Sequence, residues 1–467
     1  MRSGWFSRAS PHAPGNLGKT PGSYPLTTEL KAAACRAIDA RRDDVVAIGR
    51  QIWRAPELGF KEHRTAALAE SWLARLGLPC TTGLGLTGVK AVLEGVSPGP
   101  TVAILGELDS LLSWEHPDHD PETGAAHACG HNAQIAALIG VALGLVEGGV
   151  MAALAGRVAF IAVPAEEFVE IEERLRLRAA GRIELLAGKQ ELLRLGVFDD
   201  VDIAIMVHAT AEPRDGRLGV GGTSNGMVAK FVRYVGRAAH AGGAPHRGVN
   251  ALYAAQVALA GINALRETFL DDDHVRVHPI ITRGGDVVSA IPSDVRVETF
   301  VRAASVEAIA VAHRKVDRAL KAGALALGAR LELTTVPGYL PMYQDQRLVE
   351  LFSRNAELLV GADSVGQVGH RTGGTDMGDL SHILPVLHPF AAGATGTVHG
   401  ADFTLDDYDA VAITPAKAMA STVVDLLADD AARARQVIAE FRPRFTRAGY
   451  LEFVRSLATT ETYESAD

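Results

Sequence analysis

The sequence has few cysteines, and their number limits where the protein can work. Only three occur among 467 residues, at Cys35, Cys80 and Cys129. Three thiols cannot all pair, and so small a number in a long chain argues against a disulfide framework. We therefore expect a reducing compartment and a cytoplasmic protein.

Concentrated positive charge and a leading apolar run are also lacking. The chain carries 46 basic and 55 acidic side chains, a net charge of −9, and has no basic block. This argues against nucleic acid or an anionic membrane surface as the main partner. Residues 1–26 are rich in Pro, Gly and Ser, which favours a flexible tail over a signal peptide. The apolar run at 133–145 contains glycines and predicts a buried helix, not a membrane span.

The length predicts two or more domains, because 467 residues exceed one ordinary core. Apolar residues make up 48% and charged residues 22%, as in soluble globular proteins. Apolar runs at 101–108, 157–163 and 202–207 are typical of buried strands, and helical patterns separate them. This alternation predicts an α/β domain with a mostly parallel sheet.

After about residue 215 the pattern changes to β-α-β-β-α-β, the order of a ferredoxin-like domain. The expected strands are 226–235, 274–282, 293–303 and 330–336, and the expected helices are 248–269 and 305–327. Beyond them we expect a helix at 345–359, a strand at 384–390 and a helix at 415–428. The sequence thus predicts five parts: a tail (1–26), the first half of the main domain (27–221), an inserted domain (222–336), the second half (337–430), and a helical extension and tail (431–467).

Polar side chains follow three of the predicted strands. Asp109 ends the first, the pair Glu166-Glu167 follows the second, and His208 follows the third. Each has an ordinary explanation taken alone: a helix cap, a solvated helix start and a turn histidine. Open α/β sheets, however, bind ligands beyond the carboxyl ends of their strands. Three polar groups at that edge predict a binding site.

The stretch 125–132, Ala-Ala-His-Ala-Cys-Gly-His-Asn, holds two metal-binding side chains one residue apart. In an extended backbone Cys129 and His131 point to the same side. The alternative is a glycine turn with a buried cysteine and incidental histidines. A thiolate beside an imidazole suits zinc, with manganese or cobalt as alternatives. The candidate ligands for two divalent ions are Cys129, His131, Glu167, His208 and His399.

Such a pair of ions favours one kind of chemistry. Two ions can acidify a water molecule and polarise a carbonyl oxygen, which is what hydrolysis of an amide requires. A carboxylate next to the ions must then take the water proton and pass it to the leaving nitrogen. Glu166, the neighbour of Glu167, is the candidate for this general base.

Six motifs together resemble a known family. They are Gly106–Asp109, His127–Asn132, Pro164–Glu167, Met206–His208, Gly236–Gly242 and Gly374–Asp379. The chain resembles the co-catalytic metallopeptidases of the aminoacylase and glutamate carboxypeptidase type. Within them it is similar to the amidohydrolase branch of plant auxin-conjugate hydrolases and aminobenzoyl-glutamate utilisation protein B. The resemblance implies a metallopeptidase domain with an inserted lid that also forms a homodimer interface, and a small amide as substrate.

The resemblance also implies roles for single residues. Asp109 would orient a ligand imidazole, and His240 would reach the active site of a second copy and steady the oxyanion. Arg302 would bind a substrate carboxylate. Asn250 and Ser289 are further candidates for substrate contacts, although Ser289 stands where the family often has asparagine. Alternatively, His240 is an ordinary loop histidine and Arg302 is a solvated arginine at the edge of a sheet.

We therefore predict a metal-dependent amidohydrolase that cleaves an N-acyl amino acid or a small dipeptide-like substrate. The alternatives are a deacylase of another small N-acyl or carbamoyl compound, and a binding protein that has lost catalysis. The presence of Glu166 with all five candidate ligands argues against such a loss. The charged stretch 169–188 is expected to shape the rim of the pocket.

Overall fold

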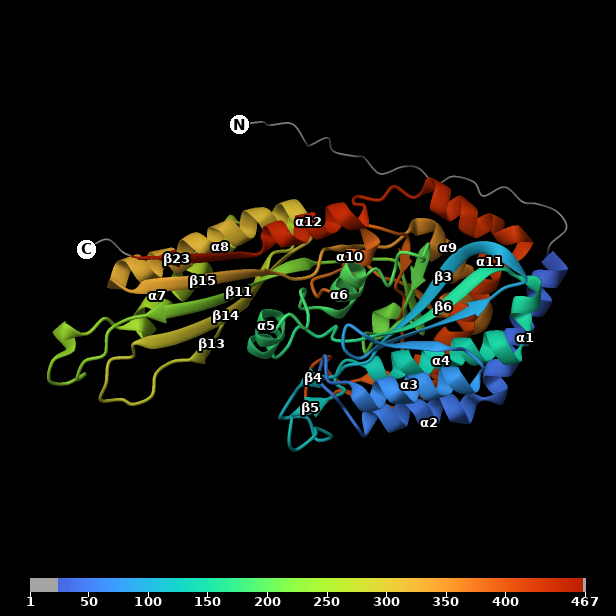
Figure 1. Ribbon diagram of the computed structural model, residues 1–467, viewed down its shortest axis with the longest axis horizontal. Helices are drawn as coiled ribbons and strands as arrows, with labels where there is room; N and C mark the ends of the chain where they lie inside the picture. The colour runs from blue at the N-terminus through green and yellow to red at the C-terminus, as the bar shows by residue number, and fades with distance from the viewer. Residues whose placement is uncertain (1–23, 465–467) are drawn as a thin grey trace.

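The computed structural model describes residues 24–464, which form two units, each built around a sheet (Figure 1). Most of the expected N-terminal tail, residues 1–26, lies outside the described residues. The first helix, α1 (Tyr24–Ala40), already begins within that range.

The sheet of the larger unit, called here the larger sheet after that unit, has the strand order β1-β2-β6-β3-β7-β19. Its strands are β1 (Cys80–Leu84), β2 (Gly88–Glu94), β3 (Ser97–Glu107), β6 (Ala155–Val163), β7 (Ile203–Ile205) and β19 (Val386–Leu387). The last four in the sheet order are parallel, whereas β1 and β2 form an antiparallel hairpin at one edge that the sequence did not predict. β3 and β6 are almost wholly buried, which explains their continuous apolar sequence.

Helices cover both faces of this sheet. One layer contains α1, α2 (Arg42–Trp53), α3 (His63–Arg75), α4 (His131–Glu147) and α11 (Thr414–Glu440). The other contains α6 (Gly188–Leu195), α10 (Met377–Ser381) and α12 (Arg447–Leu457). α4 is buried as far as Leu145, so the prediction of a buried helix is confirmed. The helical segment 409–440 is long and apolar enough to span a membrane, but most of its apolar stretch is buried inside the protein.

The second sheet is antiparallel. Its strands are β11 (Gly226–Val235), β12 (Arg276–Val277), β13 (Ile280–Arg283), β14 (Asp294–Ala303), β15 (Arg330–Pro337) and β23 (Thr459–Tyr463). Residues of β14 alternate between buried and half-buried, and the buried ones point to one face of the sheet. Helices α7 (Ala251–Ala264) and α8 (Val306–Leu327) cover that face. The elements follow the predicted β-α-β-β-α-β order, except that the strand expected at 274–282 is broken into β12 and β13.

Two further differences come from proline and from long-range pairing. The strand expected at 384–390 is broken at Pro389, which has no N–H to donate. β19 stays in the larger sheet, and β20 (Phe390–Ala391) joins a small sheet with β8 (His208–Ala209), β9 (Leu218–Val220) and β17 (Val365–Gln367). The expected helical extension, residues 431–467, contains α12 but also β23, which pairs with β15.

The charged stretch 169–188 does not form one long helix. It contains α5 (Ile171–Ala179) and a loop that leads into α6. Apolar residues of this stretch pack on the face of the second sheet that α7 and α8 leave free. Phe168, just before α5, lies 5.8 Å from the rings of both Phe300 and Tyr339. The stretch therefore joins the two units.

The remaining elements are short, apart from one helix. They are α9 (Gln346–Val360), β4 (Leu111–Leu112), β5 (Ala125–Ala126), β10 (Thr223–Ser224), β16 (Met342–Tyr343), β18 (His370–Arg371), β21 (Ala394–Thr395) and β22 (Thr404–Leu405).

Candidate active site

Polar side chains from three neighbouring parallel strands lie at the carboxyl edge of the larger sheet. Asp109 follows β3, Glu166 and Glu167 follow β6, and His208 follows β7. These strands are adjacent in the order β6-β3-β7, so their ends lie side by side. These groups therefore meet where the sequence predicted a binding site, beyond the carboxyl ends of the parallel strands.

Three more candidate ligands come from a turn and a loop. Cys129 and His131 flank Gly130, whose φ of 94° is left-handed. A Cβ at this position would lie 2.7 Å from the Cβ of Ala209, so glycine is needed here for space as well as for conformation. His399 lies in the loop between β21 and β22, and its backbone N–H donates to the carbonyl of Ala128 at 2.8 Å. This hydrogen bond ties the loop to the turn.

The five predicted ligands fall into two groups that share one residue. The first is Cys129, His131 and His208, and the second is Cys129, Glu167 and His399; in each, one ligand atom per residue lies within 4.8 Å of the others. The Cys129 Sγ is 3.3 Å from His208 Nε2, and His399 Nε2 is 3.2 Å from Glu167 Oε1. Side chains far apart in the sequence therefore converge on Cys129.

Hydrogen bonds orient two of the imidazoles. His131 donates from Nδ1 to the carbonyl and to Oδ1 of Asp109, at 3.0 and 3.1 Å. His208 donates from Nδ1 to the carbonyl of Ala209 at 2.7 Å. In both rings Nδ1 is thereby fixed as the donor to a carbonyl, so that Nε2 is the nitrogen that faces the cluster, the arrangement that metal-ligating histidines need.

The charges of the cluster favour a cation. Burial raises the pKa of the Cys129 thiol, but His208 and His131 outweigh burial and bring this pKa to about 6. Glu167 raises the pKa of His399 to about 11. Burial also opposes ionisation of Glu167, yet His399 holds its pKa below the ordinary value. The side chains of Cys129 and Glu167 are thus favoured in their negatively charged forms, next to three histidines.

The donor set fits a pair of divalent ions. His131 Nε2 and Glu167 Oε1 are buried and make no hydrogen bond; each instead faces an ionisable atom, Glu107 Oε2 at 3.1 Å and His399 Nε2 at 3.2 Å respectively. Buried polar atoms without a partner are rare and need an explanation. Thiolate and imidazole donors are those that zinc prefers.

Glu166, the predicted general base, is buried beside this cluster. Burial raises its pKa well above the ordinary value, and the carboxylates of Glu107 and Glu167 add to the effect. Glu107, His131 and Glu166 form a third close group of possible ligands. Glu107 lies within the motif Gly106–Asp109, and no role of its own was predicted for it from the sequence.

A buried ion triad behind Glu107 was not predicted. The Lys189 Nζ lies 2.5 Å from a carboxylate oxygen of Glu107 and 2.5 Å from one of Asp376. All three side chains are buried. Lys189 lies in a charged segment, and such a pattern predicts a solvated helix face. Its role as the counter-ion of Glu107 and Asp376 is visible only in the structure. Asp376 belongs to the motif Gly374–Asp379, which was the one available signal.

Arg302 reaches the same region from the second sheet. A Cβ on Gly374 would lie 3.4 Å from its Nη1, and its guanidinium lies 5.3 Å from the ring centre of Phe300. Burial lowers the pKa of Arg302, while Tyr339 and Glu166 raise it. Within residues 24–464 the side chain of Arg302 has no hydrogen bond or ion pair.

Three other predicted site residues lie away from the cluster, in the second unit. His240 Nδ1 accepts the backbone N–H groups of Gly242 and Gly243, and the carbonyl of Ser289 accepts the N–H of Ala241 at 2.8 Å. Their loops lie at the end of the second sheet remote from the larger sheet (Figure 1). Asn250 caps α7, accepting two backbone N–H groups. Its amide oxygen is therefore occupied within the chain.

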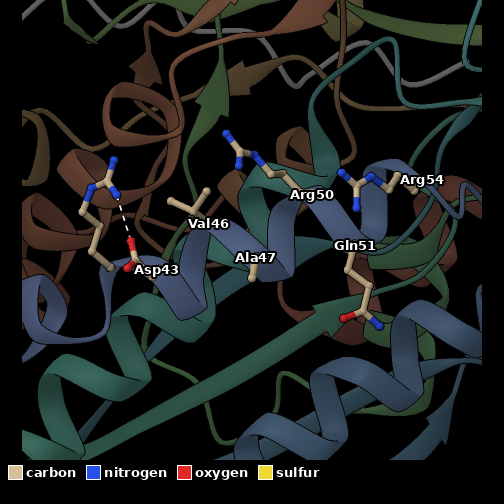
Figure 2. Close-up of a pocket in the computed structure, with 7 residues that line it drawn as sticks. Asp43, Val46, Ala47, Arg50, Gln51 and Arg54 are labelled. Atoms are coloured by element: carbon tan, nitrogen blue, oxygen red, sulfur yellow. Dashed lines mark hydrogen bonds and ion pairs between the residues drawn. The ribbon is translucent and has the colours of Figure 1, made fainter.

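A surface hollow lies away from this site. A hollow of about 610 Å³ lies along α2, lined by Val46, Arg50 and Arg54 among others (Figure 2). None of the candidate ligands lines it. The convergence of donors, not the size of a hollow, marks the active site.

Comparison with known proteins agrees with this architecture. Residues 103–424 match peptidase family M20/M25/M40. The chain is 30% identical over 437 residues to Xaa-Arg dipeptidase of Mus musculus, covering 85% of this chain and 89% of the relative. It is 28% identical over 386 residues to N-acetylcysteine deacetylase of Bacillus subtilis, covering 81% and 93%. A dinuclear metal-binding M20 peptidase of Bacillus subtilis superposes with a TM-score of 0.61 at 24% identity, covering 83% of this chain and 99% of that one.

The chain belongs to peptidase family M20/M25/M40. This membership confirms the resemblance and the fold class predicted from the sequence. It also confirms the predicted enzyme class, a metal-dependent hydrolase that acts on amide bonds.

Proposed function

We propose that this enzyme hydrolyses N-acyl amino acids or small dipeptides at a site that holds two zinc ions, with manganese or cobalt as possible substitutes. The observation that carries the proposal is the shared cysteine: Cys129 belongs to both groups of three possible ligands. In this proposal His131 and His208 complete one site, and Glu167 and His399 complete the other. Because Cys129 must stay a thiolate, we place the enzyme in the reducing cytoplasm.

The chemistry divides between the ions and Glu166. When bound, the two ions would acidify a water molecule and polarise the amide carbonyl. The carboxylate of Glu166 accepts the proton of this water and delivers it to the leaving nitrogen. Burial and neighbouring carboxylates raise the pKa of Glu166, which makes its carboxylate a stronger base.

Arg302 supports an amino acid as one half of the substrate. Its guanidinium is mostly buried and lacks an anionic partner among the described residues. A buried cation without such a partner is unfavourable, so a carboxylate of the substrate is its natural counter-ion. We propose that this contact holds the α-carboxylate of the amino acid.

A second copy of the chain supports the rest of the site. We propose that residues 222–336 form an inserted lid and dimerisation domain, and that His240 of one copy stabilises the oxyanion in the other. β23 covers one edge of the second sheet, whereas Ile280 and Ile281 of β13, and Val288 beyond it, are exposed at the opposite edge. An uncovered apolar edge favours pairing with another sheet.

The test combines metal analysis with a substrate panel. Purified enzyme is expected to contain two metal equivalents per chain and to hydrolyse members of a panel of N-acyl amino acids and dipeptides. Glu166→Gln should lose activity by a factor of about 100 to 10,000 and keep both metals. Wild-type turnover in this variant would contradict the assignment of Glu166. A wild-type enzyme inactive on the whole panel would contradict the substrate class.

A further inference from the structure

Arg174, in α5, is a buried cation without a carboxylate. Its side chain is only 2% exposed, and no ion pair joins it to any residue within 24–464. The guanidinium carbon lies 5.2 Å from the ring centre of Phe60 and 5.9 Å from that of Phe168. Burying a charge in this way is unfavourable unless other polar groups compensate it.

Backbone carbonyls provide the compensation, and two of them belong to the segment that carries Glu166. Nη1 donates to the carbonyls of Ala165 and Leu186, at 3.4 and 2.7 Å. Nη2 donates to the carbonyl of Glu167. One guanidinium therefore grips the backbone on both sides of Glu166.

This segment needs external support because its backbone is strained. Ala165 has a φ of 51°, in the left-handed region that residues other than glycine seldom adopt. Its N–H donates to the buried carboxylate of Glu62 at 2.7 Å. The N–H of Glu167 donates to Asp109 at 2.8 Å. The carboxylates hold the N–H groups, and Arg174 holds carbonyls on the other side.

A glycine leaves room for this contact. A Cβ on Gly59 would collide with Nη2 of Arg174 and would lie 2.9 Å from the Cα of Ala165. The turn before α3, the 164–167 segment and α5 thus meet at the guanidinium.

We propose that Arg174 is a positioning residue that fixes the directions of the Glu166 and Glu167 side chains through the carbonyls of Ala165 and Glu167. This inference rests on the proposed roles of these two glutamates. α5 thereby serves the reaction through the backbone of the segment that carries Glu166. A guanidinium is required, and a positive charge alone does not suffice. Its two Nη groups are held apart in a rigid plane and bind the carbonyls of Ala165 and Glu167 at the same time, which the single ammonium group of lysine cannot do in this geometry.

The test compares Arg174→Met and Arg174→Lys with Arg176→Met. Arg176 lies on the same helix and is exposed, and its one ion-pair partner among the described residues is Glu173, so it provides a matched control. Both Arg174 variants should lower kcat on the order of 100-fold and change KM less than threefold, because the glutamates are displaced while substrate binding is kept. The visible absorption spectrum of the cobalt-loaded protein should also change in both, since Glu167 is a proposed ligand. The control should match the wild type in every measurement.

Several outcomes would overturn the proposal. Wild-type kcat and an unchanged cobalt spectrum in either folded variant would do so, as would lower thermal stability with no change in kcat. If Arg174→Met does not fold, Arg174→Lys, which keeps the buried charge, decides. Failure of both variants to fold would show that Arg174 supports the whole fold. The cobalt spectrum does not depend on the substrate, so it tests positioning even if the proposed substrate class fails.

Discussion

Asp109 holds His131 with one carboxylate oxygen, at 3.1 Å from Nδ1, while its other oxygen accepts the backbone N–H of Glu167 at 2.8 Å. One buried carboxylate thus orients two proposed ligands, one from each group. Hydrogen-bond partners of this kind set the direction and the basicity of metal ligands.

The first prediction follows from this double contact. Asp109→Asn can accept only one of the two hydrogen bonds, because its amide nitrogen cannot accept. We expect metal affinity to fall roughly 10- to 100-fold, measured by competition with a chromogenic chelator. The control is Asp120→Asn, which changes a half-buried loop carboxylate whose partners among the described residues, Glu122 and Thr123, lie in its own loop. Equal affinities in both variants would show that Asp109 does not support the ligands.

A second prediction concerns the remote position of His240. If His240 acts on the second copy, a heterodimer of Glu166→Gln and His240→Ala contains one site with both residues intact. Mixing the two inactive variants should give heterodimers with up to about half of the activity of a wild-type dimer, because one of their two sites is intact. Subunit exchange is confirmed by native mass spectrometry of differently tagged chains. No recovery in proven heterodimers would exclude a shared site.

Arg302 gives a prediction about substrate binding. Replacing it with Met removes a charge-assisted contact of about 1.5 to 3 kcal/mol, so KM should rise roughly 10- to 100-fold. The rise should be confined to substrates with a free carboxylate and be absent for their carboxamides. Arg276→Met is the control, because Arg276 lies opposite Arg302 in the β12–β14 ladder and is exposed. An equal effect on carboxamides would contradict carboxylate binding.

His382 predicts a pH dependence of stability away from the metal site. Burial lowers its pKa to about 4, and its Nε2 donates to the carbonyl of Pro341 at 2.9 Å. The unfolded chain binds this proton at about pH 6.5, so between these values the unfolded state holds more protons. The contribution, of the order of 3 kcal/mol, is complete above pH 6.5 and is lost as pH falls through 4.

The measurement is the free energy of unfolding between pH 4 and 7.5 for the wild type and His382→Gln. The variant should lose stability less steeply on acidification, since glutamine does not titrate. His246→Gln replaces an exposed loop histidine and should keep the wild-type slope. Identical slopes for the wild type and His382→Gln would contradict a buried neutral imidazole.

Much of the site could be predicted because its chemistry is local in the sequence. Apolar runs gave β3 and β6, and the polar residues that follow them had to meet if the strands were parallel. Cys129 and His131 were expected to point the same way along an extended backbone. They do converge, but through the left-handed turn at Gly130 that opens α4, so the reason for their shared direction was wrong. No local pattern links His399 to Cys129, so its place beside that thiol follows only from the folded chain.

Other features depend on contacts that no local pattern contains. Arg174 and Lys189 lie in charged segments that predict solvated helices, yet both are buried because carbonyls and carboxylates from distant segments surround them. β23 is polar and exposed, and only its pairing with β15, more than 120 residues earlier, makes it a strand. Such partners become visible only when the chain is folded.

The central claim is that Cys129 joins two metal sites, and anomalous diffraction at the zinc edge tests it most directly. Crystals of the zinc-loaded enzyme should show two peaks about 3.5 to 4 Å apart, each roughly 2.3 Å from the Cys129 sulfur. His131 and His208 should flank one peak, and Glu167 and His399 the other. A single peak, or two peaks that do not share Cys129, would contradict the account.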